Sequence, residues 1–437
     1  MMYFKLSIRN SKRSFTNYLL YIVTMTILLT VMEISNCISI MGKSAHFQTI
    51  SLPLLITIIQ IILVGYIDAF MLKQRAKEFA SYLLLGMGKN KLTGMFLCEI
   101  LLIGFFCFLA GTTLGFAAYG SFYFSVTSPE IKACGFLYGK SLLYTFFYFC
   151  IIETICAFRL KHRLDKLQIR ELMYENNRNQ RERKEGHYKN WGAAFFISFV
   201  CFMGFVCGIV FLPENHITPL ISTIAIPLLL SVITFYQWIF GFLYAHRRKQ
   251  SPCIYQKNRL YILANLTSNF KTAAIMNAVF CMCFLFSAAS FMTGSLMLQP
   301  EFRLFEIDIQ QWMGISQIAV CIIFTVIYFS ILSLQQMIAL RQETKNIQIL
   351  HYLGKSNKQI KALIKKLTAL KLTMPMLMAY IIFAFCLPLL NRKMNFILPV
   401  TMRNALFQFA GVFCLCILFF YLCYFLTINK QIQNIAQ

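Results

Sequence analysis

Three Gly-Lys-Ser triplets are the residues of this sequence that come nearest to a catalytic motif. They are Gly42-Lys43-Ser44, Gly139-Lys140-Ser141 and Gly354-Lys355-Ser356. A nucleotide-binding P-loop needs a further glycine five residues before the glycine of the triplet, because its backbone wraps around the phosphates. At those positions the chain has Cys37, Cys134 and Ile349. The sequence therefore predicts that this chain binds no ATP through a P-loop.

Other motifs for catalysis or metal binding are also missing from the sequence. It contains no H-E-x-x-H, no Cys-x-x-Cys and no G-x-S-x-G. Cys281-x-Cys283 and Cys414-x-Cys416 lie in apolar runs without further ligands nearby, so we expect no metal site. The sequence leaves undecided whether Cys37 and Cys134 form a disulfide. We expect no catalytic residue, no metal and no cofactor in this chain.

Four acidic residues fall within or at the ends of apolar runs: Glu33, Asp68, Glu99 and Glu153. Intramembrane acids are functional candidates because burying a charge in lipid is costly. The last three lie near the expected inner ends of their spans, where water or a cation could neutralise them. The nearby cations are Lys73, Lys91 and Arg159. Ion pairing, conformational coupling and a proton relay stay open, and Glu33 is the candidate for lining a cavity.

The composition shows what kind of chain must position these residues. The chain is 58% hydrophobic and 13% charged, with a formal net charge of +25. Soluble domains contain about 25% charged residues. Most Lys and Arg fall in segments that we place inside, which follows the positive-inside rule rather than forming a basic groove for nucleic acid. We therefore predict a polytopic membrane protein that contacts lipid and has no nucleic-acid partner.

Ten apolar runs approach or exceed the roughly 20 residues that a membrane-spanning helix needs. They cover residues 18–40, 50–72, 92–120, 140–157, 191–211, 219–244, 273–298, 312–340, 370–390 and 405–427. The third is rich in small residues, which let helices approach closely in lipid. The basic amino end reads as an amphipathic helix on the inner leaflet. We predict an all-α protein with ten transmembrane helices and both termini in the cytoplasm.

A basic, partly apolar stretch follows the second apolar run, and a related stretch follows the eighth. They cover Gln74–Gly104 and Leu340–Leu370. The turn at Leu85-Gly86 aligns with the turn at Leu353-Gly354, and Lys77 then aligns with Lys345. Such a stretch is expected on the cytoplasmic membrane surface, where it can receive force from a soluble partner. Its repetition suggests a duplicated membrane half.

The order of motifs in the first stretch carries a family resemblance. It contains Arg75, Lys77-Glu78, Leu84-Leu85-Gly86 and Glu99. This pattern resembles the coupling segment of the FtsX-like permease family of ABC transporters. The segments FKLSIRNSKRSFTNYLLY and YQKNRLYILANLTSNFKTAAIMN resemble the bacitracin-resistance branch of that family, which has ten spans. The resemblance runs over nearly the whole chain.

Two features depart from that branch. The branch usually carries a large extracellular domain between spans seven and eight, where this chain has only Gln299–Gln311. Recognition of a peptide or lipid by that domain is therefore not carried over. Asn346 aligns with Glu78, so the two coupling helices are expected to be unequal.

The resemblance implies two FtsX-like four-helix halves joined by an extra helix pair. Residues 1–159 would form the first half, with the amphipathic helix and the first coupling helix, and residues 160–190 a charged cytoplasmic linker that is either a connector or a docking surface. Residues 191–245 would hold spans five and six, and residues 246–271 a cytoplasmic elbow. Residues 272–437 would form the second half, with the second coupling helix.

The resemblance also implies a function. The chain would be the permease subunit of an ABC transporter in a bacterial plasma membrane, and not itself an enzyme. A separate ABC-type ATPase, implied as a dimer, would bind ATP and Mg and would move the surface helices and, through spans two and eight, the outer face. The transporter would move antimicrobial peptides or confer resistance to them, or it would release their cell-wall lipid targets. A sensor histidine kinase or a small accessory membrane subunit are further implied partners.

Residues for ATPase coupling follow from the aligned motifs. They are Arg75, Lys77, Glu78, Leu85, Gly86, Arg341, Glu343, Lys345, Leu353 and Gly354. Three alternatives stay open: an exporter of peptides or lipids with an unrelated role, an ion-driven secondary transporter that uses Glu33 or Asp68, and a non-transporting signal relay.

Overall fold

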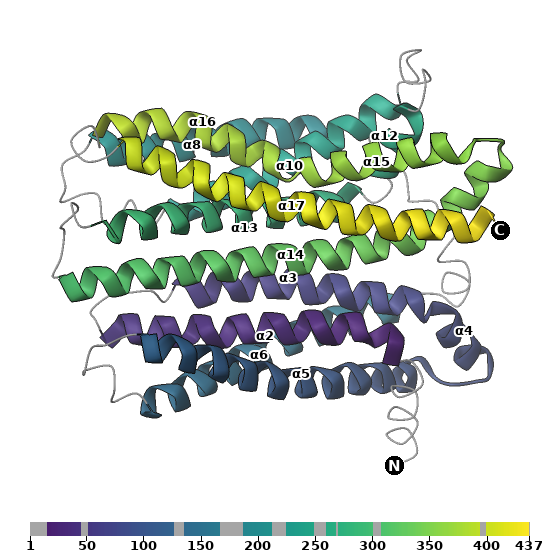
Figure 1. The fold of residues 1–437 in the computed structure, drawn as a ribbon. Coiled ribbons are helices and arrows are strands. Elements are labelled where there is room, and N and C mark those ends of the chain that lie inside the picture. The colour runs from purple at the N-terminus through teal and green to yellow at the C-terminus, as the bar shows by residue number, and fades with distance from the viewer. Residues whose placement is uncertain are drawn as a thin grey trace. The chain divides into compact units, whose positions relative to one another are not determined.

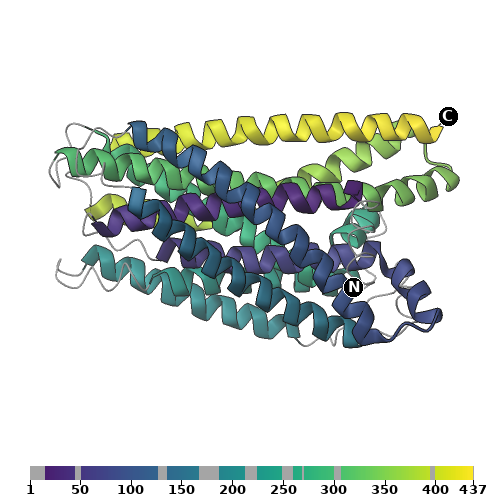
Figure 2. The same ribbon diagram turned by 90° about the horizontal axis from the view of Figure 1, so that it is seen from below.

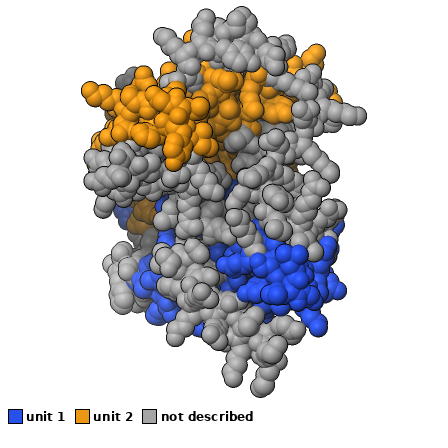
Figure 3. Space-filling view, turned by 90° about the vertical axis from the view of Figure 1, so that its right-hand side faces the viewer, with its two compact units in different colours: residues 1–179, 306–312, 329–334 blue, residues 180–305, 313–328, 335–437 orange. Residues whose placement is uncertain are grey.

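The computed structural model describes residues 15–44, 51–125, 135–166, 187–211, 224–248, 259–267, 270–299, 307–393 and 399–436. Every regular element within these ranges is an α-helix, as the apolar runs predict (Figure 1). The helices form two compact units (Figure 3). Unit 1 comprises residues 1–179, 306–312 and 329–334, and unit 2 comprises residues 180–305, 313–328 and 335–437. The predicted domain boundaries stay predictions, because this division rests on packing alone.

Unit 1 brings the first coupling stretch together with all four predicted intramembrane acids. Its described helices before residue 180 are α2 (Phe15–Ser44), α3 (Ser51–Gln74), α4 (Ala76–Leu84), α5 (Lys89–Ser125) and α6 (Gly135–Lys166). The long helix α2 packs against α3, α5 and α6, and α6 also packs against α3 and α5. The short helix α4 lies at one end of the unit, between the end of α3 and the start of α5 (Figures 1 and 2).

Glycines of α5 allow the close contact between α5 and α2. A Cβ atom at Gly111 would lie 2.8 Å from the Cβ of Leu29, and one at Gly115 would lie 2.8 Å from the Cβ of Glu33. Carbon atoms in favourable contact are about 3.5–4.0 Å apart, so neither position accepts a side chain without a shift of α2. The role predicted for small residues in the third apolar run is confirmed at these two positions.

Unit 2 contains the second coupling stretch. Its described helices are α8 (His187–Phe211), α10 (Ala225–Arg248), α12 (Arg259–Thr267), α13 (Phe270–Met297), α15 (Asn357–Thr373), α16 (Met376–Lys393), α17 (Pro399–Ala436) and most of α14 (Ile307–Tyr352). The buried helix α13 packs against α10, α16 and α17, and an edge-to-face contact between Phe284 and Phe413, with ring centroids 4.8 Å apart, joins α13 to α17.

A break separates α15 from α16 at Met374 and Pro375. Proline has no N–H to donate, so carbonyl groups near it lose their helical partners. The buried hydroxyl of Tyr236 on α10 donates to the carbonyl oxygens of Met374, at 3.1 Å, and Pro375, at 2.5 Å. The ninth span predicted at about Leu370–Leu390 includes this break, because residues 370–373 belong to α15 and α16 follows it.

Six described helices are long and apolar enough to cross a membrane: Lys89–Ala118, Tyr138–Leu164, Tyr188–Gly208, Ile226–Arg247, Ala273–Met297 and Met313–Ser333. The pair Asn357–Thr373 and Met376–Cys386, bent by 41°, would add a seventh if it is one span. Shorter apolar helices cover Ile22–Cys37, Ile56–Asp68 and Phe407–Cys423. These helices indicate a multi-pass membrane protein, and the number of ten spans stays a prediction.

Several helices extend beyond the apolar runs that predict them. Helix α14 continues as one element from Ile307 to Tyr352, so part of the predicted outer loop and of the second surface stretch belongs to the same helix as the eighth span. Helix α17 likewise runs on to Ala436. Apolarity marks the part of a helix that meets lipid, and polar residues can continue the helix on either side. The predicted amino-terminal helix and residues 167–186 of the linker lie outside the described residues.

Candidate functional site

The first predicted coupling turn is a helix end that requires glycine. Gly86 has φ +90°. Its N–H donates to the carbonyl of Leu83, at 3.1 Å, and the N–H of Met87 donates to the carbonyl of Tyr82, also at 3.1 Å. These two bonds define a Schellman motif, in which an L side chain at the glycine position would be strained. The turn connects α4 to α5.

The second predicted turn has the same bonds at the aligned positions. Gly354 has φ +81°. Its N–H donates to the carbonyl of His351, at 3.0 Å, and the N–H of Lys355 donates to the carbonyl of Leu350, at 3.2 Å. Helix α15 then begins with a capping box between Ser356 and Gln359. The alignment of Leu85-Gly86 with Leu353-Gly354 is thus an alignment of two identical helix ends.

Both turns expose a pair of large apolar side chains. In turn tip 1 (residues 84–86), Leu84 is 65% and Leu85 84% exposed. In turn tip 2 (residues 352–354), Tyr352 is 87% and Leu353 74% exposed. Lipid contact along an apolar span does not account for them, because both pairs lie at a turn between helices. Adjacent exposed apolar side chains of this kind occur at protein–protein and membrane interaction sites.

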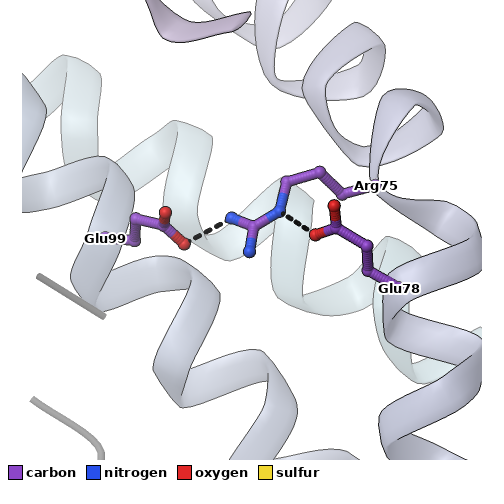
Figure 4. Close-up of polar contacts among 3 residues, drawn as sticks. All are labelled: Arg75, Glu78 and Glu99. Carbon is purple, nitrogen blue, oxygen red and sulfur yellow. Dashed lines mark hydrogen bonds and ion pairs between the residues drawn. The ribbon is translucent and has the colours of Figure 1, made fainter. Parts of the chain in front are cut away.

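A buried ion pair fastens α4 to α5 below turn tip 1. Arg75 precedes α4 and is only 3% exposed. Its Nε lies 2.9 Å from Oε2 of Glu78, and its Nη1 lies 2.5 Å from Oε2 of Glu99 on α5 (Figure 4). The guanidinium carbon lies 5.2 Å from the ring centroid of Phe79, which contacts Phe96 edge-to-face at 5.0 Å.

This geometry bears on two of the residues singled out in the sequence. Arg75, a predicted coupling residue, has its side chain buried in unit 1, and its part in ATPase coupling stays a prediction. Ion pairing was one of the roles left open for Glu99, and the structure pairs it with Arg75, which was not among the nearby cations considered, while Lys91 is exposed. The spacing of Arg75 and Glu78 could be read from the sequence as a helical pair. The third member, Glu99, is brought in by the fold.

Turn tip 2 is supported by apolar side chains instead. One face of α15 is buried through Ile360, Leu363, Ile364 and Leu367. Leu367 aligns with Glu99, and Ile364 aligns with Phe96. The predicted coupling residues Arg341, Glu343 and Lys345 lie on α14, and their side chains, like that of Lys77, lie outside the described part of the structure.

Glu33 belongs to a buried polar cluster that joins α2 to α6. Its Oε1 accepts a hydrogen bond from the hydroxyl of Ser141, at 2.8 Å, and its Oε2 is buried without a hydrogen-bond partner. Asn36 donates from Nδ2 to Oγ1 of Thr145, at 2.8 Å. The thiol of Cys37 lies 3.1 Å from Oγ of Ser141, and Cys134 lies outside the described residues, so the disulfide between them stays an open alternative.

Sequence reasoning missed Ser141 as the partner of Glu33. This serine belongs to a Gly-Lys-Ser triplet, and the triplet was considered only as a phosphate loop. A hydroxyl facing inward from an apolar helix is a weak signal, because serine can also bond to the backbone of its own helix.

Asp68 on α3 and Glu153 on α6 are both buried. Each has one carboxylate oxygen without a hydrogen-bond partner, Oδ1 and Oε1 respectively. A Cβ atom at Gly104 of α5 would lie 2.9 Å from Oε1 of Glu153, so α5 packs directly against that carboxyl group. Neither acid forms an ion pair with a described side chain, so a pairing with Arg159, one of the possibilities left open, is not found among them.

No group of three or more His, Cys, Asp or Glu side chains within the described ranges could hold a metal ion. The cysteines of the two Cys-x-Cys sequences are free thiols, buried at Cys281 and Cys283 and exposed at Cys414 and Cys416.

A comparison with protein families assigns part of unit 1. Residues 50–162 match the family described as FtsX-like permease C-terminal. The comparison with curated proteins found no match to the chain. The matched residues include α3, α4 and α5 and most of α6, with turn tip 1 and three of the four buried acids. This multi-pass membrane chain therefore contains an FtsX-like permease domain, which is typical of the transmembrane component of ABC transporters.

Proposed function

We propose that this chain is the permease subunit of an ABC transporter and that its two turn tips bind a separate ATPase. The observation that carries the proposal is the repetition of one exposed structure: a helix that ends in a left-handed glycine after two exposed apolar side chains. A dimeric ATPase would offer two equivalent surfaces, and two equivalent turns match that need.

The chemistry of the proposed complex is divided between its chains. ATP and Mg would be bound by the ATPase, in keeping with the departure of all three Gly-Lys-Ser triplets from the P-loop pattern. This chain would convert the closing motion of the ATPase into movement of its membrane helices. We place both turn tips and both termini in the cytoplasm of a bacterial cell, on the charge distribution described above.

The bacitracin-resistance branch suggests the more specific function. We propose resistance to antimicrobial peptides, by transport or by release of their cell-wall lipid targets. A target would be recognised by the membrane helices or by another subunit, because residues 299–311 are too short to form a domain. A sensor histidine kinase or a small accessory membrane protein are candidates for that subunit.

Purification of the tagged chain from its native membranes tests the ATPase interaction. We expect an ABC-type ATPase to be retained, and the double variant Leu85→Ala with Leu353→Ala to lower that retention about ten-fold or more, because apolar anchors at the centre of an interface carry most of the binding energy.

The matched control is the double variant Leu114→Ala with Leu415→Ala. These leucines are also exposed, but they lie within apolar helices. Absence of any ATPase, or equal retention in the tip and control variants, would contradict the proposal.

A second candidate function is favoured by the buried acids. Glu33, Asp68 and Glu153 each have a carboxylate oxygen without a partner, which is typical of side chains that bind a proton or a cation inside a membrane protein. An ion-driven transporter would show gradient-driven uptake by the purified chain alone in liposomes, lost in Glu33→Gln or Asp68→Asn. Uptake that requires an ATPase would exclude it.

A further inference from the structure

The two turn tips are joined to their preceding helices in different ways. Helix α14 runs without interruption from Ile307 to Tyr352 and ends in turn tip 2. The chain that leads to turn tip 1 departs from helical geometry at Arg75, which has φ −99° and ψ 6° and separates α3 from α4. The N–H of Arg75 still donates to the carbonyl of Met71, at 3.2 Å, and the N–H of Phe79 to the carbonyl of Arg75, at 3.0 Å. The short helix α4 then departs from the direction of α3 (Figures 1 and 2).

Residue preferences do not explain the departure from helical geometry at Arg75. Helix kinks usually occur at proline or glycine, or where a side chain interferes with the helix. Residues 71–78 read MLKQRAKE and contain neither proline nor glycine. The feature found at this point is the side chain of Arg75, which leaves the helix surface and reaches Glu99 on α5.

Helix α4 contacts both α3 and α5. Within α4, Ala76 and Ala80 are buried with Leu83 packed against them, and Phe79 contacts Phe96 of α5. Because Glu99 has almost no exposure to water and its other oxygen has no partner, Arg75 supplies the compensating charge there.

The second stretch has no such pair at the aligned positions. An acid, Glu343, aligns with Arg75, and the apolar Leu367 aligns with Glu99. An uninterrupted helix needs no latch, because its own backbone hydrogen bonds carry a displacement from the tip into the membrane.

We propose that Arg75 is a positioning residue that latches α4 onto α5, so that motion at turn tip 1 enters unit 1 through α5, whereas motion at turn tip 2 enters unit 2 through α14. This inference rests on the proposed function for the origin of the motion, but the latch can be tested without an ATPase. The two coupling stretches then differ in how they transmit motion. The first depends on an ion pair that can break, and the second is one continuous helix.

Hydrogen–deuterium exchange of the intact chain in lipid nanodiscs tests the latch. In Arg75→Gln we expect the amides of residues 76–84 to exchange about ten-fold faster or more, since local opening of α4 no longer breaks the ion pair. Glu99→Gln, which keeps the shape of the side chain and leaves Glu78 beside Arg75, should show a smaller rise. Arg75→Lys, which keeps the cation, should exchange more slowly than Arg75→Gln.

The control is Lys91→Gln. This variant removes an exposed cation from α5, the helix that carries Glu99, and should leave the exchange of α4 unchanged. If Arg75→Gln does not fold, Glu99→Gln decides the outcome. Unchanged exchange of residues 76–84 in every folded variant at position 75 or 99 would overturn the latch, whatever partner the chain has.

A second measurement tests the two routes in the complex purified with its ATPase. We compare exchange with and without Mg-ATP and vanadate. In the unmodified chain, exchange should change in residues 89–104 of α5 and in residues 340–352 of α14. In Arg75→Gln the change in α5 should be lost and the change in α14 kept. A change in α5 that persists, or equal loss at both helices, would overturn the inference. No response in the unmodified complex would overturn the proposed function instead.

Discussion

Leu85 and Leu353 occupy the same position in two separate turns: each is the last residue before a left-handed glycine, and they are 84% and 74% exposed. The helices that follow, α5 and α15, also begin at aligned residues, Lys89 and Asn357. The repeated element therefore extends from the end of one helix through the turn to the start of the next. This local identity, more than overall sequence similarity, supports the hypothesis of two related coupling elements.

The two glycines should respond alike to substitution. Gly86→Ala and Gly354→Ala should each lower the free energy of unfolding by about 1–2 kcal/mol, because an L residue in the left-handed region is strained. A Cβ atom at either position would meet nothing within 4 Å, so strain in the backbone is the whole effect.

Thermal unfolding of the purified chain measures this cost. The control is Gly88→Ala, two residues beyond the first turn, where a Cβ is equally unobstructed and no positive φ occurs. A loss of stability in Gly88→Ala as large as that in Gly86→Ala would contradict the assigned role of the left-handed conformation.

Some features of this structure can be predicted from the sequence and others cannot. The helices and both turns can be predicted, because apolar runs, Leu-Gly pairs and flanking lysines are local signals. The continuous course of α14 and the departure from helical geometry at Arg75 cannot, since both depend on what lies beside the chain in three dimensions. The pairing of Arg75 with Glu99 and that of Glu33 with Ser141 each join residues on different helices, so no local pattern reveals them.

Packing between α2 and α5 should be sensitive to methyl groups at two glycines. Gly111→Ala and Gly115→Ala should each destabilise unit 1 by about 1–3 kcal/mol, because overpacking forces neighbouring atoms apart. Gly120→Ala, on the same helix with no neighbouring atom within 4 Å of its Cβ, is the matched control. Thermal unfolding in one detergent compares the three variants, and equal stability of all three would show that α2 and α5 do not pack as closely as described.

The hydrogen bond between Ser141 and Glu33 should contribute measurably to stability. Ser141→Ala leaves Oε1 of Glu33 without its hydroxyl donor, and we expect a loss of about 1–3 kcal/mol. Thr154→Ala is the control on the same helix, because this exposed threonine bonds only to the carbonyl of Cys150, one turn away. If thermal unfolding finds both variants equally stable, the cluster around Glu33 does not hold α2 to α6.

Exchange of one residue between the turn tips tests whether they are the same docking element. Leu84→Tyr gives turn tip 1 the residues Tyr-Leu-Gly that turn tip 2 carries, and the hydroxyl is free to reach water because Leu84 is 65% exposed. We expect this variant to retain its ATPase within about two-fold. Leu84→Asp, which places a charge where an apolar contact is expected, should reduce retention about ten-fold or more.

Both Leu84 variants leave the latch at Arg75 and the glycine untouched, so a difference between them isolates the exposed surface from the fold beneath it. Retention of the ATPase by Leu84→Asp would mean that the partner binds elsewhere. Loss of the ATPase by Leu84→Tyr would mean that the two tips, although built alike, fit different surfaces. In that case the asymmetry seen at Arg75 would extend to the contact itself.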